Sequence, residues 1–142
     1  MSGGILNNGM RWTLVAGTIV LAGATLWYVL QPPSDVKIAG SMGVRVPELS
    51  AEAEEGAALF AENCAACHGP HASGGDGGPP LIHKIYEPSH HGDGAFLMAA
   101  RNGVRQHHWR FGNMPRIDTV SDADVARIVT YVREVQRANG IE

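Results

Sequence analysis

Cysteine is scarce in this chain of 142 residues, and no segment shows the alternating pattern of a half-buried β-strand. The only cysteines are Cys64 and Cys67, so a zinc site built from two cysteine pairs is excluded. A redox-active cysteine pair of the thioredoxin type occurs in a βαβ unit, whereas the residues before Cys64 indicate a helix. The function of the two cysteines must therefore be inferred from the residues next to them.

Those neighbours form the sequence Cys64-Ala65-Ala66-Cys67-His68, a Cys-x-x-Cys-His motif. This motif is the attachment signature of a c-type haem. Residues at positions i, i+3 and i+4 lie on one face of a helical turn, which brings Cys64, Cys67 and His68 to the same side. The two sulfurs can then reach the two vinyl groups of one porphyrin while the imidazole ligates its iron. The sequence therefore predicts one covalently attached haem c, with its iron bound by His68.

A second iron ligand is predicted at Met114, which lies in the sequence Gly-Asn-Met-Pro well after the haem motif. A thioether is a soft, neutral ligand, and its pairing with histidine raises the reduction potential of the iron. Pro115 stiffens the chain immediately after this methionine. Met98 lies in a predicted helix, where we expect it to pack in the core. His107 or His108 would instead give a bis-histidine site of lower potential.

The amino-terminal part differs in composition from the rest of the chain. Residues 12–30 contain no charged residue, and at a helical rise of about 1.5 Å per residue they would span about 28 Å, close to the hydrocarbon thickness of a bilayer. Trp12 begins this run and Trp27 and Tyr28 lie near its end, as expected of residues at membrane interfaces. We predict that residues 1–11 form a short inside segment and that residues 12–30 form one transmembrane anchor.

A cleaved signal peptide is the alternative for this region, because Ala22-Gly23-Ala24 fits a small-residue cleavage site. The hydrophobic run continues beyond this site as far as Leu30, which favours the uncleaved anchor. Either arrangement exports the rest of the chain. We therefore expect a single-pass protein of the bacterial inner membrane, with its remaining domain on the periplasmic side.

Residues 31–47 are rich in proline and glycine and predict a flexible linker. Residues 48–142 then predict one haem domain of the all-α class with long loops, preceded by the single transmembrane helix. Ser50 is the expected N-cap of a first helix that runs towards Cys64. A second helix is predicted over residues 94–102.

The clearest helix is the last one. Ser121 and Asp124 resemble a capping box in which aspartate replaces glutamate, and Gly140 follows the helix. Apolar residues at helical spacing form one stripe, made up of Val125, Ile128, Val129, Val132 and Val135. Residues 69–92 and 103–120 are long loops without an evident element, which we expect to wrap around a haem.

Over about residues 48–140 these features resemble a small single-haem cytochrome c of the class I type, whose ligating methionine lies near the C-terminus. The resemblance is carried by Gly56, Phe60, Cys64, Cys67, His68, Gly69, Gly78, Pro79, Leu81, Asn102, Gly103, Met114, Pro115 and Tyr131. It implies that the first and last helices cross near Gly56 and an aromatic residue. It also implies that the Pro79 carbonyl accepts the N–H of the His68 ring and fixes the orientation of that ring.

An electron-transfer protein is expected rather than an enzyme, because iron with both axial positions filled leaves none for a substrate. We expect it to relay single electrons between membrane complexes such as a quinol–cytochrome c oxidoreductase, a terminal oxidase or a reaction centre, as a tethered shuttle or as a subunit. Between residues 94 and 117 there are four arginines and no carboxylate, which predicts a basic surface that steers acidic partners. Membrane lipid would surround the anchor, and no nucleic-acid partner is expected.

Two alternatives stay open. A haem enzyme, such as a peroxidase or a small-ligand reductase, would need a labile sixth site, where His107 and His108 could act as acid–base groups. A copper-handling haem protein is the second alternative, because imidazoles suit copper. The histidines outside the haem motif are His71, His83, His90, His91, His107 and His108.

Overall fold

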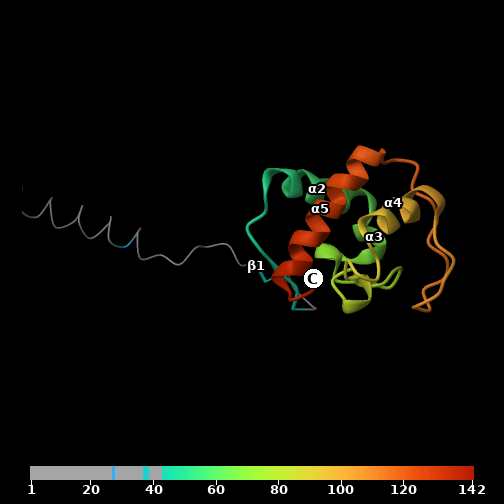
Figure 1. Ribbon diagram of the computed structural model, residues 1–142, viewed down its shortest axis with the longest axis horizontal. Coiled ribbons are helices and arrows are strands. Elements are labelled where there is room, and N and C mark those ends of the chain that lie inside the picture. The colour runs from blue at the N-terminus through green and yellow to red at the C-terminus, as the bar shows by residue number, and fades with distance from the viewer. Residues whose placement is uncertain (1–26, 28–36, 39–42) are drawn as a thin grey trace, which may run out of the picture. The chain divides into compact units, whose positions relative to one another are not determined.

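The computed structural model of the chain describes residues 27, 37–38 and 43–142 (Figure 1). None of the helices in this described part is long and apolar enough to cross a membrane. The predicted anchor over residues 12–30 lies outside the described residues, apart from Trp27.

Residues 35–142 form one compact unit, which contains the helical domain. Its elements follow in the order β1 (Lys37–Ile38), β2 (Arg45–Val46), α2 (Ala51–Asn63), α3 (Ala65–His68), the 3-10 helices η1 (Pro70–Ala72) and η2 (Lys84–Tyr86), α4 (Asp93–Asn102) and α5 (Asp122–Ala138). Strands β1 and β2 pair in antiparallel orientation and are the only sheet in the described region. The predicted helical domain with long loops is confirmed, with this small hairpin as an addition.

Local signals in the sequence set the helix ends where they were predicted. The Ser50 side chain accepts a hydrogen bond from the Ala53 backbone N–H at the start of α2. Ser121 and Asp124 form the predicted capping box at the start of α5. Helix α4 ends at Gly103, whose φ of +71° is a backbone conformation that favours glycine.

Helices α2 and α5 pack against each other at the centre of the domain (Figure 1). They approach so closely at Gly56 that a Cβ atom there would lie 2.0 Å from the carbonyl oxygen of Arg127. One turn further along α2, the rings of Phe60 and Tyr131 lie 5.6 Å apart, and both residues are buried. The helix crossing implied by the resemblance is therefore present. All five residues of the predicted apolar stripe on α5 are buried as well.

We expect Gly56→Ala to lower the free energy of unfolding by about 3 kcal/mol, the upper end of the usual range for overpacking. The added methyl group would meet backbone atoms of α5, which cannot move aside as a flexible side chain can. Chemical denaturation measures the difference. Gly94→Ala is the matched control, because open space surrounds Gly94 near the start of α4 and alanine there should be neutral or slightly stabilising. Equal stability of Gly56→Ala and the parent protein would contradict the close crossing.

The folded domain begins earlier than the sequence predicted. Val44 and Val46 are buried in the core, although both fall within the predicted linker of residues 31–47. The Arg45 backbone N–H donates to Asn139 Oδ1 over 3.0 Å, and Asn139 Nδ2 donates to the Arg45 carbonyl over 2.7 Å. The predicted boundary at the end of the linker therefore falls inside the folded domain. Two valines at alternate positions make too short a pattern to distinguish a strand from a loop.

Candidate haem site

The Cys-x-x-Cys-His motif forms a tight helical turn directly after α2. Cys64 ends α2, where its N–H donates to the Phe60 carbonyl over 2.9 Å, and it also begins α3. The Cys64 carbonyl accepts the N–H groups of Cys67 and His68 over 3.2 and 3.0 Å. Burial, with a smaller contribution from the neighbouring Cys67, raises the pKa of Cys64 to about 11. These hydrogen bonds bring both thiols and the imidazole to the wall of one cavity.

The His68 ring is oriented by one hydrogen bond to the backbone. Its Nδ1 lies 2.8 Å from the Pro79 carbonyl oxygen. Because a carbonyl oxygen can only accept, Nδ1 carries the proton and Nε2 keeps a lone pair for a metal ion. Burial lowers the pKa of His68, and the bond to Pro79 opposes that shift in part, which favours the neutral ring that a metal ligand requires. This is the contact that the resemblance implies for Pro79.

Glycines allow the loop after the motif to fold back against it. Gly69 has a φ of +73°, and a Cβ atom there would lie 2.0 Å from the carbonyl oxygen of Gly74. A Cβ atom on Gly77 would lie only 3.3 Å from the Sγ atom of Cys67. The backbone therefore passes close enough to the motif to bring the Pro79 carbonyl against the imidazole.

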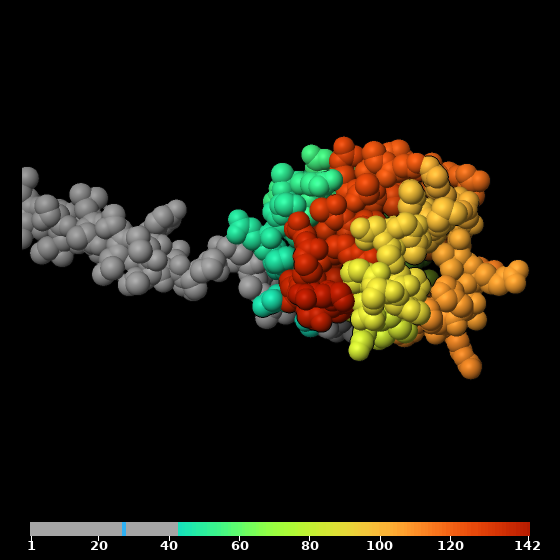
Figure 2. Space-filling view, in the orientation of Figure 1, coloured from blue at the N-terminus to red at the C-terminus, as the bar shows by residue number. Residues whose placement is uncertain are grey.

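A mostly apolar cavity of about 500 Å³ lies beside this turn, within the usual range for cofactor sites. In the space-filling view, a hollow separates the yellow segment near residue 90 from the orange segment near residue 110 (Figure 2). The cavity is lined by Cys64, Cys67 and His68, and by the predicted second ligand, Met114. Two thiols, an imidazole and a thioether around an apolar space are the donor set that a covalently attached haem needs. The residues therefore fit that cofactor.

Met114 is held at the cavity by a short backbone bridge. Its N–H and its carbonyl pair with those of Val104, both over 2.9 Å. At the neighbouring Gly103, a Cβ atom would lie 2.5 Å from the Met114 carbonyl oxygen, so this close approach requires glycine. The Asn102-Gly103 and Met114-Pro115 pairs of the sequence thus belong to one structural unit.

The alternative iron ligands lie at the edges of the same cavity. Met98 contributes to the lining but is 54% exposed, so the prediction that it packs in the core is wrong. The reason is that the cavity, rather than apolar side chains, occupies the space beside this part of α4. His107 and His108 are exposed and also line the cavity. The pKa of His108 lies below its ordinary value because of desolvation and, next, because of its neighbours His107, His91 and His90.

Trp109 offers an unused hydrogen-bond donor at the cavity. Its indole Nε1 is buried and has no hydrogen-bond partner among the described residues. Burial raises the pKa of Tyr86, and the nearby indole N–H opposes that rise in part, although the two groups form no hydrogen bond. Buried donors are almost always paired in folded proteins. The orphaned N–H therefore fits a bound group with acceptor oxygens, as a haem propionate has.

Sequence reasoning missed two buried polar residues of α5, Arg133 and Gln136, which are 7% and 1% exposed. Arg133 donates to the carbonyls of Tyr86 over 2.7 Å and His91 over 2.5 Å. Gln136 donates to the Leu81 carbonyl over 2.8 Å. Together these hydrogen bonds connect the loop before α4 to helix α5. Their spacing could have identified them. Both positions continue the apolar stripe of α5, and a polar side chain at such a position is buried and must find hydrogen-bond partners.

Comparison with known proteins identifies the fold family. A family model described as Cytochrome c matches residues 53–136, which is more than half of the chain. No curated protein matches the chain, and no solved structure does. The matched region contains the haem motif and Met114, and cytochromes of this kind carry covalently attached haem c. The chain belongs to the cytochrome c family.

Proposed function

We propose that this protein carries single electrons, with His68 and Met114 as the two axial ligands of a haem c that is attached through Cys64 and Cys67. The observation that supports this proposal is a single apolar cavity lined by all four residues. When bound, the haem supplies an iron centre that gains and loses one electron. Because both axial positions would be filled, no open position is left for a substrate.

The residues around the cavity orient the ligands and exclude water. The Pro79 carbonyl keeps His68 in the tautomer whose Nε2 is free to bind a metal ion. The backbone bridge to Val104 and the close approach of Gly103 fix the backbone of Met114. The apolar lining keeps water from the site, and exclusion of water together with a thioether ligand favours a high reduction potential.

We propose that residues 12–30 tether the domain to the bacterial inner membrane and that the domain works on the periplasmic side. The support comes from the sequence, in which this run is uncharged, is long enough to cross a bilayer and has aromatic residues near both ends. A cytochrome tethered in this way relays electrons between neighbouring membrane complexes without being lost by diffusion.

We propose that its partners are membrane redox complexes with acidic docking surfaces, such as a quinol–cytochrome c oxidoreductase, a terminal oxidase or a reaction centre. The loop that carries Met114 contains Arg105 and Arg110, which are exposed and form no salt bridge with any described residue. The basic surface is smaller than predicted, because the other two arginines of this region are paired with carboxylates. The two pairs are Arg101 with Asp122 and Arg116 with Asp118.

Carbon monoxide tests the carrier proposal on the purified protein with its haem attached. We expect no rapid spectral change when carbon monoxide is added to the reduced, folded protein, because Met114 would have to leave the iron first. The Met114→Ala variant, in which that position is open, is the positive control. Rapid binding by the parent protein would contradict the proposal and favour a haem enzyme, with His107 and His108 at the cavity as its acid–base groups.

A further inference from the structure

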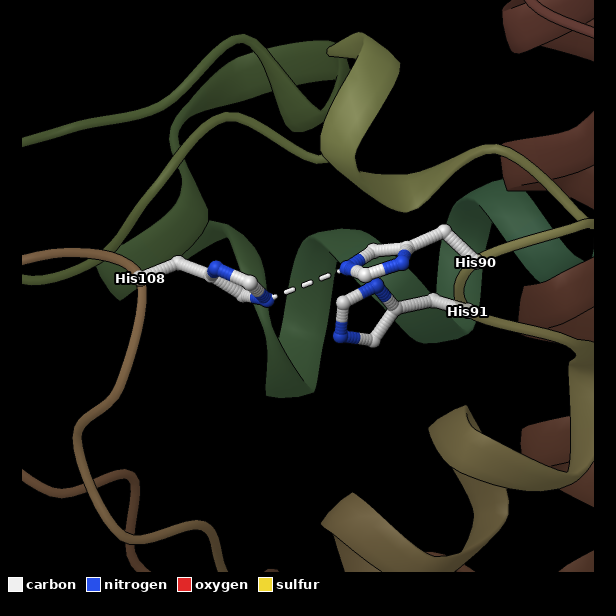
Figure 3. Close-up of side chains that lie close together, drawn as sticks. All are labelled: His90, His91 and His108. Atoms are coloured by element: carbon white, nitrogen blue, oxygen red, sulfur yellow. Dashed lines mark hydrogen bonds between the residues drawn. The ribbon is translucent and has the colours of Figure 1, made fainter.

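Three histidines gather at the exposed edge of the cavity, and we call them the histidine cluster (Figure 3). His90 and His91 lie in the loop before α4, and His108 lies in the loop that carries Met114. One ring nitrogen from each of the three lies within 4.8 Å of the other two. His90 and His108 are exposed and His91 is half-buried, and both His91 and His108 line the cavity. The cluster therefore extends from the cavity wall to the solvent.

The spacing of the nitrogens suits a metal ion. Zinc binds imidazole nitrogens at about 2.0–2.1 Å in tetrahedral sites, so the nitrogens of two ligands lie about 3.3–3.4 Å apart. The Nε2 atoms of His90 and His108 form a hydrogen bond over 3.3 Å, a distance equal to the spacing of two nitrogens on one ion (Figure 3). A ligand nitrogen of His91 lies within 4.8 Å of those of the other two histidines. A metal ion bound by both Nε2 lone pairs would replace this hydrogen bond.

His91 is held in the form that a metal ligand needs. Its Nδ1 lies 2.7 Å from the Ile85 carbonyl oxygen, so Nδ1 carries the proton and Nε2 keeps its lone pair. The His91 carbonyl accepts a hydrogen bond from the buried Arg133 over 2.5 Å, which fixes the backbone at this point. A second hydrogen bond that orients the ring is the usual companion of a metal-ligating histidine.

A fourth imidazole lies beside the cluster. The ring centroid of His107 is 4.4 Å from that of His108, and its ring stacks on His91 at 6.0 Å. Its Nδ1 lies 2.9 Å from the Arg105 carbonyl oxygen, which again leaves Nε2 with the lone pair. His107 or a water molecule is thus available for a fourth coordination position.

We propose that His90, His91 and His108 bind one divalent ion of a late first-row transition metal, Cu²⁺ or Zn²⁺, at the edge of the cavity. A donor set of imidazoles without carboxylates selects these ions over Mg²⁺ and Ca²⁺, which prefer oxygen ligands. None of the three histidines is needed to attach the haem or to ligate its iron in the proposed carrier. The ion would join the loop before α4 to the loop that carries Met114, and so would hold the rim of the cavity closed.

The test uses the untagged, full-length protein with its haem attached, solubilised in detergent. Zn²⁺ and, in a separate arm, Cu²⁺ are titrated by calorimetry, and bound metal is counted by elemental analysis after dialysis. We expect one ion per haem for the parent protein. His90→Gln/His108→Gln should weaken binding by more than about 100-fold, since even losing a hydrogen-bond partner of a ligand costs 10–100-fold. Both side chains are exposed and neither is an iron ligand in the proposed carrier, so this variant should keep the haem spectrum of the parent.

His71→Asn is the matched control, because His71 lies outside the cluster and asparagine tolerates its φ of +54°. This variant should bind the metal as the parent protein does. Thermal unfolding gives an independent readout, since Zn²⁺ should raise the midpoint of the parent and of His71→Asn but not that of the double variant. The proposal is overturned if the parent binds neither ion at one per haem, or if the double variant binds as tightly as the parent.

Discussion

Replacing Met114 with alanine is expected to abolish the near-infrared band of the oxidised protein that reports methionine–iron ligation. The substitution removes the thioether that the Val104 bridge holds at the cavity wall. The reduction potential should fall by roughly 0.1–0.3 V, a substantial part of the range of about 0.8 V that axial ligands span. Optical spectroscopy and a potentiometric titration measure the two changes.

Two further variants separate the role of Met114 as a ligand from its role in packing. Met114→Leu keeps an apolar side chain of similar size but has no sulfur, so it should lose the band as completely as the alanine variant does. Met98→Leu is the control, because Met98 also lines the cavity but is more than half exposed. It should keep both the band and the potential. A band that survives in Met114→Leu would assign the ligand to another residue.

The double variant Cys64→Ala/Cys67→Ala is expected to lose all covalently bound haem, because these are the only thiols in the chain. In a host that matures c-type cytochromes, intact-mass spectrometry should find the parent chain with the added mass of one haem and the double variant at the bare chain mass. We also expect the double variant to be largely unfolded, because a domain of this size has a small core and its apolar cavity of about 500 Å³ would be left unfilled.

The single variant Cys67→Ala is the control for the double variant. One remaining thioether at Cys64 should still retain the haem on the chain, so its mass should include one haem. If the parent protein itself had only the bare chain mass, the electron-carrier proposal would fail. The histidine cluster is tested on parent protein whose attached haem has been verified by mass, so a failure to bind metal there would leave the electron-carrier proposal intact.

Features encoded by neighbouring residues were predictable from the sequence. The haem motif needs only one helical turn, and the backbone hydrogen bonds from Cys67 and His68 to the Cys64 carbonyl form that turn. The starts of α2 and α5 depend on side chains one turn away, such as Ser121 and Asp124, so the pattern of capping residues located them. The buried stripe of α5 followed from its helical period.

Long-range pairings were not predictable, because loops carry no periodicity and the partners lie far apart in the chain. Pairing of Arg45 with Asn139 made part of the predicted linker a component of the fold. Arg133 is charged and would be placed at the surface by residue type, yet burial and carbonyl partners from a distant loop make it part of the core. His90 and His108 lie in two different loops, so the contact between them depends on how those loops pack together.

The sequence by itself determined that this protein carries two thiols and an imidazole on one turn, since that arrangement depends only on the geometry of a helix over five residues. Only the tertiary structure decided that Met114 lies at the same cavity as His68. The backbone of Met114 is fixed there by Val104 and by the absence of a side chain at Gly103. Contacts of this kind depend on how segments that are distant in the sequence pack against one another, and the residues next to Met114 do not specify that packing.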